Sequence, residues 1–308
     1  MSGVTIEDRI AGCFLAGAIG DAIGAHYEGN PPTAGFLVPP TLRVTDDTEL
    51  TIATCESIVG CGSVAAESVA NSFLRWFRQR RIHGVGASTL KALTELDAGG
   101  HWAMVGATGE RSAGNGAAMR IAPLAFVLDP DRESDRQTIR DVCRITHRND
   151  EAYIGALAIL RSIRHVVAGK SFDVSFLPAL VDSLPDSRVR DRLIDVRDSS
   201  PSLTEYATKF ASSGYVVDSV PLSILAATRS SDLMETIREI VQCGGDTDTI
   251  GSMFGHIFGA AFGTGALPTE IVSQIDGVSL VRETAATFAR TSIAIKNRLQ
   301  PSGGCDRS

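Results

Sequence analysis

The stretch GGDTDTIGSMFGHIFGAAFG, residues 244–263, joins an acidic, threonine-rich start to a run in which glycine and alanine recur among apolar residues. Such small residues cannot fill space with large side chains, so the backbone of a helix built from them approaches its neighbours closely. The segment AGCFLAGAIGDAIGA, residues 11–25, has the same composition. We therefore expect these two segments to form helices in the middle of a bundle.

Apolar residues recur three and four positions apart along much of the chain, as in EAYIGALAILRSIRHVV, residues 151–167. This is the periodicity of a helix, and the alternating pattern of strands is scarce. The sequence therefore predicts an all-α protein. The expected helices cover residues 6–23, 48–59, 64–80, 87–96, 134–145, 151–167, 189–196, 222–228, 232–243, 247–262 and 280–296.

Two breaks interrupt the helical pattern. EGNPPTAGFLVPP, residues 28–40, carries four prolines and two glycines, which predicts a long loop. The second break, residues 99–116, is rich in glycine. Neither resembles a linker between domains, and no repeat is present. We expect one domain over residues 1–300 and a flexible C-terminal tail over residues 301–308.

The composition excludes several classes of partner. The chain has 308 residues, with 29 Lys+Arg against 36 Asp+Glu and a net charge of −7, which argues against nucleic acid as the main partner. Six cysteines without a CxxC pair favour reduced thiols and the cytoplasm. The start lacks the features of a signal peptide, and no apolar run is long enough to span a bilayer, so we expect no membrane partner. The oligomeric state stays open.

The acidic stretch at residues 246–249 has a counterpart in VTDDTEL, residues 44–50. Asp and Thr are good N-caps, so either stretch alone could simply begin a helix. One cap explains one acid, however, and each stretch carries two aspartates. Four aspartates in the centre of a bundle would cost several kcal/mol per unpaired ion, which a hard divalent cation would offset. No His/Cys spacing indicates zinc.

Five motifs, taken in order, resemble those of the ADP-ribosylglycohydrolase family, which includes dinitrogenase-reductase-activating and ADP-ribosylarginine hydrolases. They are GDAIGAHYEG (20–29), VTDDTEL (44–50), SAGNGAAMRIAPLA (112–125), THRND (146–150) and GGDTDTIGSMFGHIFGAAFG (244–263). The resemblance implies a single compact orthogonal helical bundle with two Mg²⁺ or Mn²⁺ ions as cofactors. It also implies an ADP-ribosylated protein, or a small molecule containing ADP-ribose, as the partner.

The resemblance implies roles for residues of these motifs. The implied metal ligands are Thr45, Asp46, Asp47, Asp246, Asp248 and Thr249. The implied substrate contacts are Ser112, Gly114, Asn115, Gly116 and His147. Glu28 and Asp47 are both candidates for the catalytic carboxylate that handles the proton, and the sequence does not rank them. We expect Asp21, on a helix of small residues, to have a structural hydrogen-bonding role.

The activity expected from the resemblance is metal-dependent hydrolysis of the N-glycosidic bond between ADP-ribose and a protein arginine. Two alternatives stay open. One is hydrolysis of O-linked ADP-ribose, on serine or as O-acyl-ADP-ribose, and the other is a family member that binds ADP-ribose without turnover. Some nitrogenase-type members carry an acid at the position of Ser112, and some relatives acting on serine carry an aromatic residue at Ala113. These departures leave the acceptor open.

Overall fold

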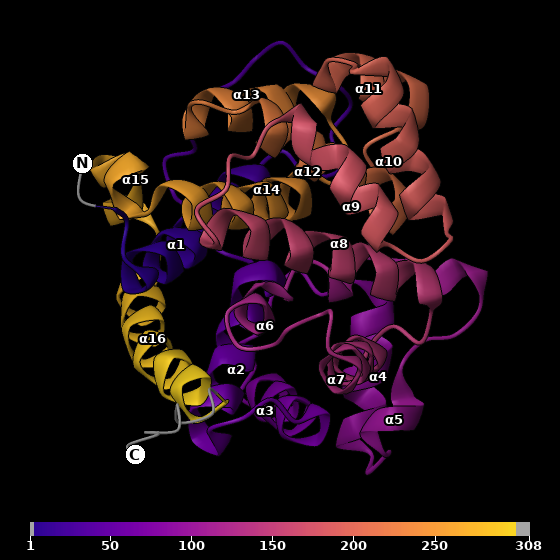
Figure 1. Cartoon of the computed structure of the whole chain (residues 1–308), viewed down its shortest axis with the longest axis vertical. Coiled ribbons are helices and arrows are strands. Elements are labelled where there is room, and N and C mark those ends of the chain that lie inside the picture. The colour runs from indigo at the N-terminus through magenta and orange to yellow at the C-terminus, as the bar shows by residue number, and fades with distance from the viewer. Residues whose placement is uncertain (1–2, 300–308) are drawn as a thin grey trace, which may run out of the picture.

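The computed structural model describes residues 3–299, and the predicted tail at 301–308 lies outside them. The described residues form sixteen α-helices and four short 3-10 helices, with no strand among them (Figure 1). Their buried apolar side chains make one connected core. The predicted all-α bundle is confirmed.

The two glycine-rich segments form central helices, as predicted, and these helices pair with each other. They are α1 (Ile6–Gly24) and α14 (Thr247–Phe262), and most residues of both are buried. A Cβ added at Gly259 would lie 2.0 Å from the carbonyl oxygen of Gly12, and one at Gly255 would lie 2.2 Å from the carbonyl oxygen of Ala16. The backbones therefore touch directly, which only small residues permit.

The other helices surround this pair. Next to α1 lie α2 (Asp46–Cys61) and α16 (Val278–Leu299), and next to α14 lie α8 (Asp150–Val167) and α12 (Val216–Arg229). The remaining α-helices are α3 (Ala66–Arg78), α4 (Ala87–Asp97), α5 (Trp102–Val105), α6 (Ala122–Ala125), α7 (Glu133–Arg144), α9 (Leu177–Ser183), α10 (Arg188–Ser199), α11 (Leu203–Phe210), α13 (Leu233–Cys243) and α15 (Thr269–Gln274). The 3-10 helices are η1 (Glu110–Ser112), η2 (Asn115–Ala117), η3 (Val174–Phe176) and η4 (Thr264–Ala266). Within the described part of the chain, no helix has the length and apolar character needed to cross a membrane.

All eleven predicted helices are present, but α12 starts well before its predicted start at residue 222. The prediction stopped at Pro221, which lies inside the helix. A proline there leaves the carbonyl of the residue four positions earlier, Val217, without its helical donor. The hydroxyl of Tyr206 donates to that carbonyl at 3.4 Å and to the carbonyl of Asp218 at 2.9 Å. A contact from α11 thus supplies the missing donor.

The predicted loop at residues 28–40 is confirmed and contains no helix. Its middle is tied to Tyr27, whose hydroxyl accepts from the backbone N–H of Leu37 at 2.9 Å and donates to the Leu37 carbonyl at 2.6 Å. The second predicted break, 99–116, is wrong in part, because α5 and η1 lie within it. Such short helices have too few turns for apolar residues to recur in the sequence with a helical period.

Candidate metal centre and its cavity

The start of α2 is fixed by an acid from α1. Asp21 is fully buried and accepts the backbone N–H groups of Thr45, at 3.0 Å, and Thr48, at 3.1 Å. It also accepts both threonine hydroxyls, at 2.7 and 2.5 Å. A carboxylate at a helix N-terminus satisfies N–H groups that have no partner within the helix. Asp21 therefore has the structural role predicted for it and sets the position of the acids that follow Thr45.

The start of α14 is fixed by two glycines in left-handed conformations, with φ of 69° at Gly244 and 76° at Gly245. A Cβ at Gly244 would lie 2.7 Å from the carbonyl oxygen of Asn30, and one at Gly245 would lie 2.2 Å from that of Ser212. Only glycine fits such approaches. The Gly245 carbonyl accepts from Gly29 at 2.8 Å, and the Gly245 N–H donates to Asn30 at 3.0 Å. This backbone pairing brings the residue before Gly29 to the start of α14.

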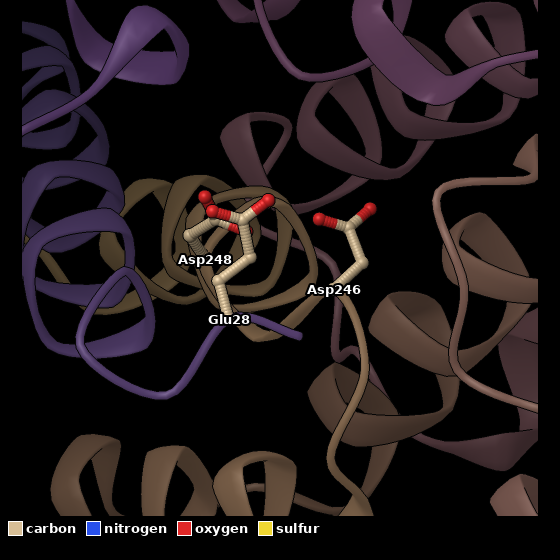
Figure 2. Close-up of side chains that lie close together, drawn as sticks. All are labelled: Glu28, Asp246 and Asp248. Carbon is tan, nitrogen blue, oxygen red and sulfur yellow. The ribbon is translucent and has the colours of Figure 1, made fainter. Parts of the chain in front are cut away.

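Three carboxylates meet there. Glu28, Asp246 and Asp248 each offer one oxygen, and the three oxygens lie within 4.8 Å of one another. Figure 2 shows the three side chains gathered at the N-terminal end of α14, with Glu28 reaching them from the turn that follows α1. The sequence motifs mark Glu28 as a catalytic candidate only. The structure places it with two of the implied metal ligands.

The acidic stretch of α2 joins the same site. The hydroxyl of Thr249 donates to Asp47 Oδ2 at 3.3 Å, although the two residues are 202 positions apart. Asp46 lines the same cavity as Asp246 and Asp248. The hydroxyl of Thr45 lies 3.4 Å from Asp47 Oδ2, but its shorter hydrogen bond is to Asp21. The two stretches predicted to belong to one site are therefore in contact.

The acids of this cluster raise one another's pKa. Burial is the main cause and the negative charge of neighbouring acids the second, and together they raise the pKa of Asp46 and Asp47 well above the usual range. The same two causes raise the pKa of Asp248 to about 8. Glu28, at the cavity edge, has a pKa raised by partial burial and then by Asp248. Without a cation, the folded protein would therefore hold Asp248 protonated at neutral pH.

The surroundings of one carboxylate oxygen show whether the cluster suits a divalent cation. Asp47 Oδ1 is buried and has no hydrogen-bond partner in the part of the chain that the structure describes. A buried charged oxygen without a partner costs several kcal/mol, and a bound cation removes that cost. The surrounding donors are all carboxylate and hydroxyl oxygens, the ligands that Mg²⁺ and Mn²⁺ prefer. The residues present therefore fit such an ion.

A cavity of about 420 Å³ opens beside the acids. Gly114, Asn115, Gly116 and His147 line it, as expected of substrate contacts. The side chain of Asn115 also makes two hydrogen bonds. Its Nδ2 donates to Asp246 Oδ2 at 2.5 Å and to Ser219 Oγ at 3.1 Å. Asn115 thus orients an acid of the cluster and also lines the cavity.

His147 is buried, with its Nδ1 2.8 Å from the hydroxyl of Thr146. Burial, and next the charge of Arg120, lower the pKa of His147 to about 3, so the ring is neutral at physiological pH. A Cβ at Gly114 would lie 3.0 Å from Nε2, and one at Gly116 would lie 2.8 Å from Cε1. The imidazole edge therefore fills the space that side chains at these two glycines would need.

Among the predicted substrate contacts, Ser112 does not line the cavity. It is buried, and its hydroxyl donates to the Gly109 carbonyl at 2.6 Å, which closes a local turn. Other residues that line the cavity were not predicted from the sequence. They include Gly84, Gly86, Ser88, Thr89, Met119 and Ser213. The segment GVGAST, residues 84–89, has two glycines and two hydroxyls at the start of α4 and could have been noticed.

Comparisons with known proteins agree with the motif order. The sequence model described as ADP-ribosylglycohydrolase matches residues 2–300. The chain is 26% identical over 294 residues to the ADP-ribosyl-dinitrogen reductase glycohydrolase of Rhodospirillum rubrum, covering 90% of this chain and 93% of that protein. It is 26% identical over 284 residues to the ADP-ribosylarginine hydrolase Tri1 of Pseudomonas putida (strain GB-1), covering 87% and 74%. A solved ADP-ribosylglycohydrolase-related protein complex superposes with a TM-score of 0.71 and 26% identity, over 93% of this chain and 98% of that one.

Proposed function

Because this chain belongs to the ADP-ribosylglycohydrolase family and is an enzyme of that class, we propose that it cleaves the N-glycosidic bond between ADP-ribose and an arginine of a modified protein. The observation that carries this choice is the group of carboxylates of Glu28, Asp246 and Asp248 at the cavity. A guanidine leaves only after it gains a proton, and a carboxyl group at the cavity can supply that proton. Two relatives are named for dinitrogen reductase and for ADP-ribosylarginine, which supports the same acceptor.

We propose two Mg²⁺ or Mn²⁺ ions as cofactors. Their ligands come from the two acidic stretches and are Thr45, Asp46, Asp47, Asp246, Asp248 and Thr249. Asp47 Oδ1, which has no hydrogen-bond partner among the described residues, supports this assignment. When bound, such ions lower the pKa of a water and orient the hydroxyls of the ribose.

Of the two candidates for proton transfer, the geometry favours Glu28. Its carboxylate lines the cavity, whereas Asp47 is 1% exposed and does not. Hydrolysis passes through a state with oxocarbenium character, and a guanidine leaves only after it gains a proton. Partial burial raises the pKa of Glu28, which favours the protonated form that a general acid requires. Asn115 holds Asp246 in place, and the glycines beside it let backbone groups approach the ligand.

The test compares ADP-ribosylarginine and ADP-ribosylserine peptides, each incubated with the protein in Mg²⁺, Mn²⁺ or EDTA. We expect release of ADP-ribose from the arginine peptide with a divalent ion and its loss in EDTA. Faster release from the serine peptide would replace arginine by an O-linked acceptor. Binding of ADP-ribose with no release from either peptide would indicate a member without turnover.

The compartment we propose is the cytoplasm. Within residues 3–299, the cysteines at positions 13, 55, 61, 143 and 243 form no disulfide, and four of them are buried. Reduced thiols of this kind are typical of cytosolic proteins. The partner would then be a modified protein of the same compartment.

A further inference from the structure

A line of hydrogen bonds runs behind the cavity wall from Arg120 to His147. Arg120 is 1% exposed, and its Nη2 donates to Thr146 Oγ1 at 2.9 Å and to the Val142 carbonyl at 3.3 Å. Its Nη1 donates to the carbonyl of Gly116. Thr146 is fully buried, and its Oγ1 lies 2.8 Å from His147 Nδ1. The line therefore ends on a ring that lines the cavity.

Only one placement of the protons along this line gives the hydroxyl proton of Thr146 an acceptor. A guanidinium can only donate, so Thr146 Oγ1 accepts from Arg120. The hydroxyl proton then needs an acceptor, and within residues 3–299 its other hydrogen-bond neighbour is His147 Nδ1. A ring proton on Nδ1 would leave the buried hydroxyl proton without an acceptor, at a cost of roughly 1–3 kcal/mol. Nδ1 is therefore the acceptor, and the proton of the neutral ring sits on Nε2.

The protonated nitrogen lies on the cavity side. Nε2 is the ring atom closest to a Cβ built at Gly114, and it has no protein hydrogen-bond partner among the described residues. His147 thus presents an N–H group that adds no positive charge. A cationic ring would be attracted to the acid cluster and would compete with a metal ion for the carboxylates. A neutral donor avoids that competition.

We propose that Thr146 and Arg120 are positioning residues, which hold His147 as the Nε2–H tautomer so that it donates to an oxygen of the bound ligand. The ligand oxygen belongs to the ribose or the diphosphate of ADP-ribose, and this part rests on the proposed function. The role of His147 is orientation of the ligand. Transfer of a proton from it has no part in the reaction.

Tautomers are read directly by NMR from the two imidazole nitrogens of protein labelled with ¹⁵N-histidine. The chain has six histidines, and the signals that disappear in His147→Gln assign this one. We expect Nε2–H in the wild type and in Thr146→Ser, which keeps the hydroxyl. Thr146→Val keeps the size and loses the hydroxyl, and we expect it to show a mixture of tautomers.

The functional consequence is measured by calorimetry with ADP-ribose and Mg²⁺-loaded protein. We expect Thr146→Val to weaken binding about 5- to 10-fold, the effect of one hydrogen bond, and Thr146→Ser to stay within about twofold of the wild type. A wild-type ring protonated on Nδ1 overturns the proposal, and so does a Thr146→Val protein with unchanged tautomer and affinity. If Thr146→Val does not fold, the tautomer of His147 in the wild type still decides whether the proposal holds. A wild type that does not bind ADP-ribose contradicts the proposed function instead.

Discussion

Glu28 reaches the acid cluster because the backbone of its neighbours is held in place. Gly29 and Asn30 form two backbone hydrogen bonds with Gly245, one in each direction. Glu28 and Gly29 are also the first two residues of the proline-rich loop, residues 28–40. The pairing fixes the base of that loop, so a closing movement would begin after Asn30. Glu28 then stays at the cavity edge throughout.

At this scale we predict that Glu28→Gln lowers kcat by about 10²- to 10⁴-fold at saturating Mg²⁺, because the amide keeps the size but cannot transfer a proton. Its metal affinity, measured by calorimetry, should change little. Asp46→Asn is the matched control. It should weaken metal binding first and regain activity as Mg²⁺ is raised. A Glu28→Gln enzyme with near-normal kcat would leave Asp47 as the better candidate.

The contact between α1 and α14 is the feature that matters at the scale of elements. Each helix places a glycine where the other presents its backbone, and the acids follow from that packing. Asp21 of α1 holds the start of α2, and the start of α14 carries Asp246 and Asp248. A shift of one helix along the other would separate the acids.

We predict that Gly255→Ala destabilises the protein by about 3 kcal/mol, because its Cβ would lie 2.2 Å from the Ala16 carbonyl oxygen and force the helices apart. Gly60→Ala is the control, since Gly60 is exposed on α2 with no atom within 4 Å of the added Cβ. That change should stabilise by about 0.5–1 kcal/mol. Urea denaturation of the metal-free proteins measures both. Equal midpoints for the two variants would contradict the role assigned to the contact.

Long helices and the acidic stretches could be predicted from the sequence, because period and composition are local properties. Features that depend on distant residues could not. The start of α12 depends on the hydroxyl of Tyr206, and the place of Glu28 depends on the pairing of Gly29 with Gly245. The hydrogen bond from Asn115 to Asp246 joins residues 131 positions apart. Each of these contacts exists only in the folded chain.

At the scale of the whole molecule, the acid cluster makes stability depend on pH. The folded pKa of Asp248 is raised to about 8, while an unfolded aspartate titrates near pH ~4. Between these values the folded state binds more protons than the unfolded state. The contribution of such groups is therefore fully present below pH ~4 and is lost as the pH rises toward 8, at about 1.4 kcal/mol per pH unit for each proton.

We therefore predict that protein treated with EDTA has a lower Tm at pH 8 than at pH 6, and that Asp248→Asn reduces this fall. Divalent ion should raise the Tm of the wild type by mass action, and most at pH 8, where it no longer competes with protons. Thermal denaturation at both pH values, with and without Mg²⁺, measures these effects. An equal gain from Mg²⁺ in Asp248→Asn would mean that the ion binds elsewhere.

The pairing of α1 with α14 also sets the order in which the chain can fold during synthesis. The two helices are separated by roughly 220 residues, and each is the other's main neighbour in the core. A ribosome adds about 5–20 residues per second, so about 10–45 s pass between the synthesis of α1 and that of α14. Through that interval α1 lacks its native partner, and the apolar surface that packs against α14 is not buried by it. In that interval α1 is thus a natural binding site for chaperones, and the metal centre forms only after α14 has been synthesised.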